Sequence, residues 1–284
     1  MKNPKLPLLR LMCSLALVGL VAAVPRLHAA ADDDFDSYAI KITATWFYSQ
    51  PSGTLQSATG GGLIDLKKDI GFNSYSTFAG KLDWKFTRKN HLYLVAIPFT
   101  TSRQTVLTRT ITFQGQTFVA GLATQSELKA HLYAPGYQYD ILRRRRGHLG
   151  IAIQIDTFDS RASFNAAAQV TGDGVRHSAV SASASRVVPI PVLGPEFRYY
   201  LTNSPRFYVQ ANVYGMYFFG YGNFLSSAGS LGLRVAKHLD VIAGYQLGSR
   251  LDAHNSSSHN RIGLSLTQTG AVVGVEVPFG GGGQ

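Results

Sequence analysis

Cysteine is almost absent from this chain of 284 residues, and charged residues are scarce. A single cysteine excludes a disulfide framework and a zinc site built from thiolates. Charged residues make up 15% of the chain, against about 25% in an average soluble domain, while 45% are hydrophobic. This combination of low charge and ordinary apolar content excludes a disordered chain. It leaves a β-rich globular protein or a membrane protein of the β type.

Long apolar runs are also missing beyond residue 31, where no stretch reaches 18 apolar residues. The sequence therefore predicts no transmembrane helix. The N-terminus differs, because a basic start precedes an apolar run from Leu11 to Val24, and three alanines follow at 29–31. That run has about 14 residues, fewer than the 20 or so that span a bilayer. We interpret residues 1–31 as a cleaved secretory signal peptide and 32–37 as an acidic lead.

The chain does contain a repeated two-residue alternation. From Tyr38 to Tyr48 the even positions are apolar or aromatic, and the odd positions are mostly small or polar. About ten such segments follow one another between residues 38 and 279, joined alternately by short connections and by long ones around Gly60, Gln114, Gly172, Ser226 and Asn255. A transmembrane β-strand needs about 9–11 residues, apolar outward and polar inward. The pattern predicts an all-β fold, a closed antiparallel transmembrane barrel with short periplasmic turns, longer outer loops and a Gly-rich tail at 280–284.

Two segments decide how the alternation is interpreted. After Asn90 we take Tyr93 and the odd positions as facing lipid, which turns Leu92 and Leu94 toward the lumen. In the last segment the apolar positions change from even before Thr267 to odd from Val273 onward. A bulge near Gly270 would produce this change, and we favour it over a turn at 267–270.

The chain resembles small bacterial outer-membrane β-barrels, in the broad manner of the OmpW and OmpA-transmembrane families. The end of the last segment carries the resemblance most specifically: Gly274, Val277 and Phe279 look like the C-terminal assembly signal of such proteins. Val273 stands where a polar residue is expected before the glycine, and five residues follow Phe279. The resemblance implies assembly by the barrel-assembly machinery with periplasmic chaperones. It implies location in the outer membrane.

Charged side chains recur on the rows that we predict to face the lumen. A lumen of about ten strands is little wider than one filled by side chains, and buried charges must be paired. We therefore favour a self-neutralising plug, with a narrow pore for small polar solutes as the alternative. The predicted network is Lys41, Lys81, Asp83, Lys85, Asp140, Asp156, Glu196, Arg198, Arg234, Arg250 and Glu276.

Aromatic side chains gather at the ends of the predicted strands, as rings do at the two lipid–water interfaces. A soluble barrel would place its apolar face inside and would not need aromatic ends on long strands. The predicted girdle is Trp46, Tyr48, Trp84, Phe86, Tyr93, Tyr139, Tyr199, Phe207, Tyr217 and Phe219.

Other chemistry has weak support. Asp252, His254 and the stretch 256–259 hold the residue types of a hydrolytic triad, but within one loop of ordinary polar composition. The run Arg143–Arg146 is interpreted as a periplasmic turn near anionic headgroups and not as a nucleic-acid site. Histidine spacing suggests no metal, and no glycine-rich phosphate loop opens a helix, so we predict no cofactor.

We therefore expect a monomeric outer-membrane barrel with a structural or passive solute-transport role, and no enzyme. An enzyme acting at the loop rim and a surface adhesin or recognition barrel are the alternatives. The expected partners are outer-membrane lipids, together with the assembly machinery during biogenesis, and not nucleic acid.

Overall fold

The computed structural model describes residues 34–56, 63–113, 116–166, 169–170, 176–177, 180–218, 222–254 and 263–280. Ten long strands form its wall, which confirms the predicted all-β class and strand number. They are β1 (Ile40–Gln56), β3 (Tyr75–Lys85), β4 (Asn90–Val106), β7 (Ala123–Arg144), β8 (Gly147–Ala166), β11 (Val180–Tyr200), β12 (Phe207–Phe218), β13 (Gly222–Ala236), β14 (Leu239–His254) and β15 (Gly263–Phe279).

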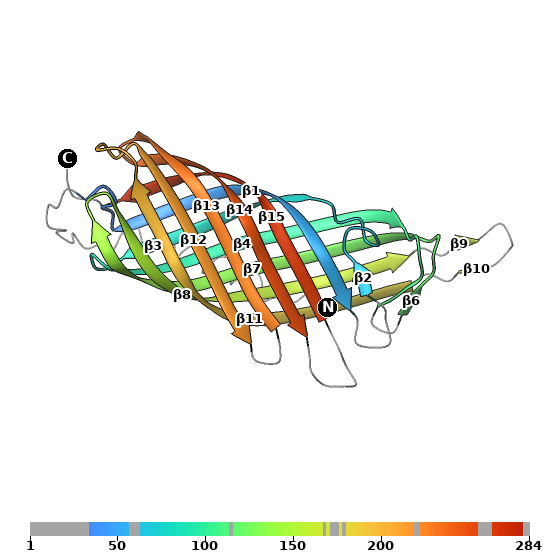
Figure 1. Cartoon of the computed structure of the whole chain (residues 1–284). Coiled ribbons are helices and arrows are strands. Elements are labelled where there is room, and N and C mark those ends of the chain that lie inside the picture. Colours follow the sequence, from blue (N-terminus) through green and yellow to red (C-terminus); the bar gives the residue numbers. More distant parts are fainter. Residues whose placement is uncertain are drawn as a thin grey trace, which may run out of the picture.

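The ten strands close into an antiparallel barrel, because β15 pairs with β1 from Ile40↔Phe279 to Gln56↔Gly263 (Figure 1). Short turns join the strands at one end, and the long connections lie at the other. The β12–β13 connection is an exception to the expected long loops: it spans only 219–221, and Ser226 lies within β13. Short strands β2 (Leu63–Asp65), β5 (Ile111–Phe113), β6 (Gln116–Phe118), β9 (Gln169–Val170) and β10 (Arg176–His177) belong to the outer loops.

The two faces of β8 show why this sequence makes a barrel wall. Its outward residues are apolar and exposed, with Ile153 at 53% exposure, whereas Ala152 and Asp156 point into the lumen and are buried. A wall of this kind pairs its backbone groups between strands and presents apolar side chains to lipid. The described residues include no helix that is long and apolar enough to cross a membrane.

Strand β4 has the opposite phase to the one predicted. Tyr93 is buried in the lumen, and Leu92 and Leu94 are 43% and 46% exposed on the outside. The hairpin register explains this, since Leu92 lies opposite Trp84 and directly opposed residues share a face. Both rows of β4 are apolar, so hydrophobicity alone did not distinguish them. The hydroxyl of Tyr93 finds a lumen partner in Gln154, at 2.8 Å.

The phase change near the C-terminus does not mark a bulge in β15. Strand β15 is one strand, as favoured, and pairs with β1 without a register shift through Gly270. The bulge lies in β14, between Gln246 and Ser249, and it turns Arg250 outward to an exposed position beside Leu225. Arg250 is therefore not part of the lumen network.

Four strands continue beyond the rest of the barrel at the outer end. The β3–β4 pairing covers Gly80–Lys85 and the β11–β12 pairing starts at Leu193, whereas β4, β7, β8 and β11 remain paired with one another further out (Figure 1). Strand β7 has 22 residues, about twice what a bilayer requires. We call this four-stranded extension the outer wall.

The corrected phase of β4 can be tested directly. Leu94→Arg should lower the free energy of unfolding in lipid by about 2–4 kcal/mol, because the new charge faces hydrocarbon. Leu94→Val is the matched control, with a cost of roughly 1 kcal/mol or less. Denaturant titration of the reconstituted barrel measures both. An arginine at position 94 that costs no more than valine would restore the original phase.

Candidate functional site

The segment just before β1 crosses the periplasmic mouth of the barrel. Phe35 N–H donates to the Arg145 carbonyl, and Arg234 donates to the Phe35 carbonyl from β13. The Phe35 ring meets Tyr200 edge-on at 5.6 Å between centroids. Because these partners lie on β11, on β13 and in the β7–β8 turn, residues 34–38 form a strap inside the mouth. We call this segment the N-terminal strap.

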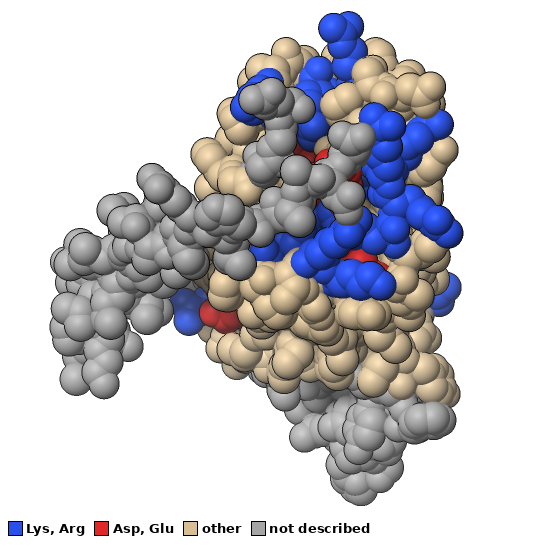
Figure 2. Space-filling model, turned by 90° about the vertical axis from the view of Figure 1, so that its left-hand side faces the viewer, with Lys and Arg blue, Asp and Glu red and all other residues tan. Residues whose placement is uncertain are grey.

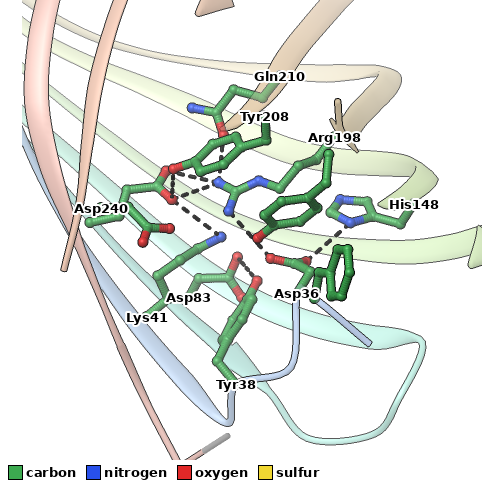
Figure 3. A network of polar contacts seen from close by, with 12 residues as sticks. Asp36, Tyr38, Lys41, Asp83, His148, Arg198, Tyr208, Gln210 and Asp240 are labelled. Atoms are coloured by element: carbon green, nitrogen blue, oxygen red, sulfur yellow. Dashed lines mark hydrogen bonds and ion pairs between the residues drawn. The ribbon is translucent and has the colours of Figure 1, made fainter. Parts of the chain in front are cut away.

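Asp36 anchors the strap in a buried ionic cluster (Figure 3). Its carboxylate lies 3.3 Å from Arg198 Nη1, 3.5 Å from Lys85 Nζ and 3.2 Å from His148 Nδ1. Burial alone would raise the pKa of Asp36, but Lys85, Lys41 and Arg198 outweigh burial and hold that pKa well below its usual value. The ionised carboxylate of Asp36, surrounded by cations from three strands, therefore holds the strap in place.

The cluster extends around the whole mouth. Arg198 also donates to both Glu276 oxygens, at 2.9 and 2.7 Å. His91 lies between two carboxylates, with Nδ1 3.2 Å from Asp83 and Nε2 3.1 Å from Asp140. An imidazole that donates to both must be positively charged. Six carboxylates then face six cations: Asp34, Asp36, Asp83, Asp140, Asp240 and Glu276 against Lys41, Lys85, His91, Arg143, Arg198 and Arg234.

Lys81, Asp156 and Glu196 lie higher in the lumen, in a second layer. Lys81 Nζ is 3.4 Å from Glu196, which also accepts a hydrogen bond of 2.8 Å from Tyr214. Asp156 accepts from Gln154 at 2.6 Å. Apolar and aromatic side chains fill the rest of this level: Tyr93, Ala152, Ile190, Val192, Tyr214 and Phe224.

A third, apolar layer packs at the outer end. Two loops meet at the outer end of the barrel. Arg109, in the loop between β4 and β7, donates from Nε to Asp69, in the loop between β1 and β3, at 2.9 Å and so holds the two loops together. These hydrogen bonds from Arg109 lower the pKa of Asp69. The packed side chains are Ile64, Leu66, Ile70, Phe72, Leu107, Ile111, Phe113, Phe118, Leu122, Phe164 and Ala166. We call this layer the loop cap.

A small cavity of about 30 Å³ lies beneath the loop cap, between Phe72, Phe99 and Gln268. That volume is about two probe spheres of water size. Among the described residues no group of three or more His, Cys, Asp or Glu side chains is arranged to hold a metal ion.

The predicted aromatic residues lie at the strand ends and face outward, with two exceptions. Trp46, Trp84, Tyr139, Tyr199 and Phe207 are about two-fifths to one-half exposed. The same exposed face includes Tyr48, Tyr217 and Phe279, and Phe86 is half-buried. Tyr93 lies in the lumen, as described above, and Phe219 is outside the described residues. Of the assembly signal, Val277 is half-buried and Gly274 fits closely against the Ala44 carbonyl of β1.

Sequence reasoning missed the strap and the groups that bind it. Asp36 precedes the first strand, and Tyr38 was assigned to the outward row although it donates to Asp83 in the lumen at 3.1 Å. Tyr38 lies before the start of β1, where strand alternation does not apply. The acidic lead beside a lumen rich in basic residues was the available signal. The side chains of Asp252 and His254, and all of 256–259 and 1–33, lie outside what the structure describes.

Comparison with known proteins supports the fold. No family model matches the chain, and no curated protein matches its sequence. Among solved structures, the outer membrane protease OmpT from Escherichia coli is similar with a TM-score of 0.53 at 13% identity, covering 87% of this chain and 100% of that one. The toluene transporter TodX from Pseudomonas putida has a TM-score of 0.39 at 8% identity, covering 86% and 90%. The attachment invasion locus protein Ail of Yersinia pestis has 0.29 at 9%, covering 82% and 97%.

The chain therefore has the fold of a bacterial outer-membrane β-barrel, and the outer membrane is the location that this fold indicates. A likeness to the OmpW family in particular is not shown. The expectation that the chain is not an enzyme is contradicted by the similarity to OmpT, because OmpT is an enzyme, a protease, with a similar barrel fold. At 13% identity the similarity concerns the fold alone.

A double-mutant cycle tests the ionic seal. Arg198→Met should cost about 3–5 kcal/mol of unfolding free energy, because Asp36 and Glu276 lose a buried partner. Glu276→Met should cost a similar amount, and the double variant much less than the sum of the two. Denaturant unfolding in the same detergent measures all four proteins. Additive costs would mean that the two side chains are not coupled.

The strap gives a pH dependence of known sign. Because folding lowers the pKa of Asp36, its stabilisation is complete above the unfolded value of about 3.9 and is lost as pH falls through the folded pKa. The difference in unfolding free energy between wild type and Asp36→Asn should be smaller at pH 3 than at pH 5. The exposed Asp159→Asn is the matched control. A difference that grows on acidification would contradict the assignment.

Proposed function

We propose that this protein is a sealed outer-membrane barrel that works at the cell surface, as a rigid scaffold for the outer wall and loop cap. Of the two roles expected from sequence, the structural one is proposed and passive transport through the lumen is not. The observation that carries the proposal is the filling of the lumen at three successive levels: the ionic mouth, the aromatic middle layer and the loop cap.

The middle layer weighs most against a pore for polar solutes. At the level of the Lys81–Glu196 pair, the side chains of Ile190, Val192 and Phe224 are 1–5% exposed and pack into the lumen, which leaves less of its cross-section to polar groups. Below them Arg198 and Asp36 are bonded to each other and are not available to a passing solute. The charged groups that suggested a selective pore are thus occupied in closing it.

The outer wall supports a role at the surface. Below it, β8 presents isoleucines to lipid, but further out the same row presents Asp159 and Arg161 as exposed side chains. Lys129, opposite Arg161 on β7, is also exposed. A change from apolar to charged along one outward row marks where the wall leaves the bilayer. The outer wall and loop cap therefore project into water as one packed unit.

Electrical recording tests the seal. The refolded mature chain, verified by heat-modifiable mobility on gels, should produce no resolved conductance steps in planar bilayers, and liposomes that contain it should not swell in a small sugar. A general porin, reconstituted in parallel, shows that either assay detects an open lumen. Reproducible single-channel steps from the wild-type chain would overturn the proposal.

A further inference from the structure

Cations and anions are sorted at the periplasmic end of the barrel. Each of the four turns there has an exposed lysine or arginine within it or at its edge: Arg88 and Lys89, Arg144 and Arg145, Arg206, and Lys237. The carboxylates described at the same end are almost fully buried, and Asp34, the most exposed of them, has a side chain only 8% exposed. Figure 2 shows this end, with blue side chains over its upper and right-hand parts and across its middle, and red ones recessed among them.

The exposed cations lie beside side chains that face lipid. Lys89 Nζ is 6.0 Å from the centre of the Tyr139 ring, which is 43% exposed on the outer face of β7. Arg206 directly precedes the exposed Phe207. Lys237 lies between Val235 and Leu239, which are exposed at 52% and 36%. Aromatic and aliphatic residues mark the edge of the hydrocarbon, so the cations beside them are at the depth of phospholipid phosphates.

We propose that this ring of turn cations binds the headgroups of anionic phospholipids in the periplasmic leaflet. The ring is distributed over four turns around the barrel, which fits an annulus of lipid better than a protein partner that docks at one spot. Cations held together without exposed acids repel one another, and anionic headgroups relieve that repulsion. The inference stands on the charges of the turns and is independent of whether the lumen conducts.

Lipid retention measures the effect. The mature barrel is placed in nanodiscs with equal phosphatidylglycerol and phosphatidylcholine, and native mass spectrometry counts the lipids that remain bound. Wild type should retain phosphatidylglycerol at least threefold over phosphatidylcholine. The ring variant, Lys89→Gln, Arg144→Gln, Arg206→Gln and Lys237→Gln, should retain the two lipids about equally. Added salt should reduce the wild-type preference.

A matched control removes the same number of cations from the other end of the barrel: Lys67→Gln, Lys68→Gln, Lys129→Gln and Arg161→Gln. This control should keep the wild-type preference, and heat-modifiable mobility should show that both variants fold. An equal loss in the control and the ring variant would overturn the proposal, since net charge alone would then explain it. A wild type without lipid preference that sediments with peptidoglycan, while the ring variant does not, would assign the ring to the cell-wall polymer instead.

Discussion

The structure depends on one constraint: a lumen of ten strands leaves little room for solvent, so the charged side chains that enter it need polar partners. Arg198 is the centre of that pairing, because it joins Asp36 of the strap to Glu276 of the last strand. The contact links the residues that precede β1 to β15, the strand that closes the barrel onto β1. Closure of the wall and closure of the mouth are thus supported by the same guanidinium.

The two ends of the lumen are filled by side chains of opposite chemistry, and the membrane explains the difference. Within the bilayer the outside of the barrel must be apolar, so the polar residues of an alternating strand turn inward and seal the mouth as ion pairs. Beyond the bilayer the outer wall meets water, and the alternation is free to reverse. There Phe164 and Leu266 point inward to the loop cap, and Arg161 points outward.

This reversal explains which parts of the structure could be predicted from the sequence. The isoleucines of β8 alternate with small and polar residues inside the bilayer, and their orientation was predicted correctly. Leu266 belongs to the reversed region, so its apolar side chain was mistaken for a sign of a bulge in β15. Tyr93 could not be placed by hydrophobicity, because its ring suits either face and only its hydroxyl needs the lumen. The strap precedes the strands and has no periodicity to analyse.

Charge sorting follows from the seal itself. Many of the carboxylates of the chain lie in the ionic mouth and not on the surface, because a buried cation is tolerated only beside a buried anion. Of the 27 Lys and Arg of the chain, four lie in residues 1–31, and the other 23 still outnumber the 16 Asp and Glu, so pairing inside the lumen leaves an excess of cations on the surface. At the periplasmic end that excess appears on the turns, next to the girdle of Trp84 and Tyr139. The same placement of charge, with the carboxylates inside the mouth and the remaining cations on the turns, therefore produces both the ionic mouth and the basic surface toward lipid.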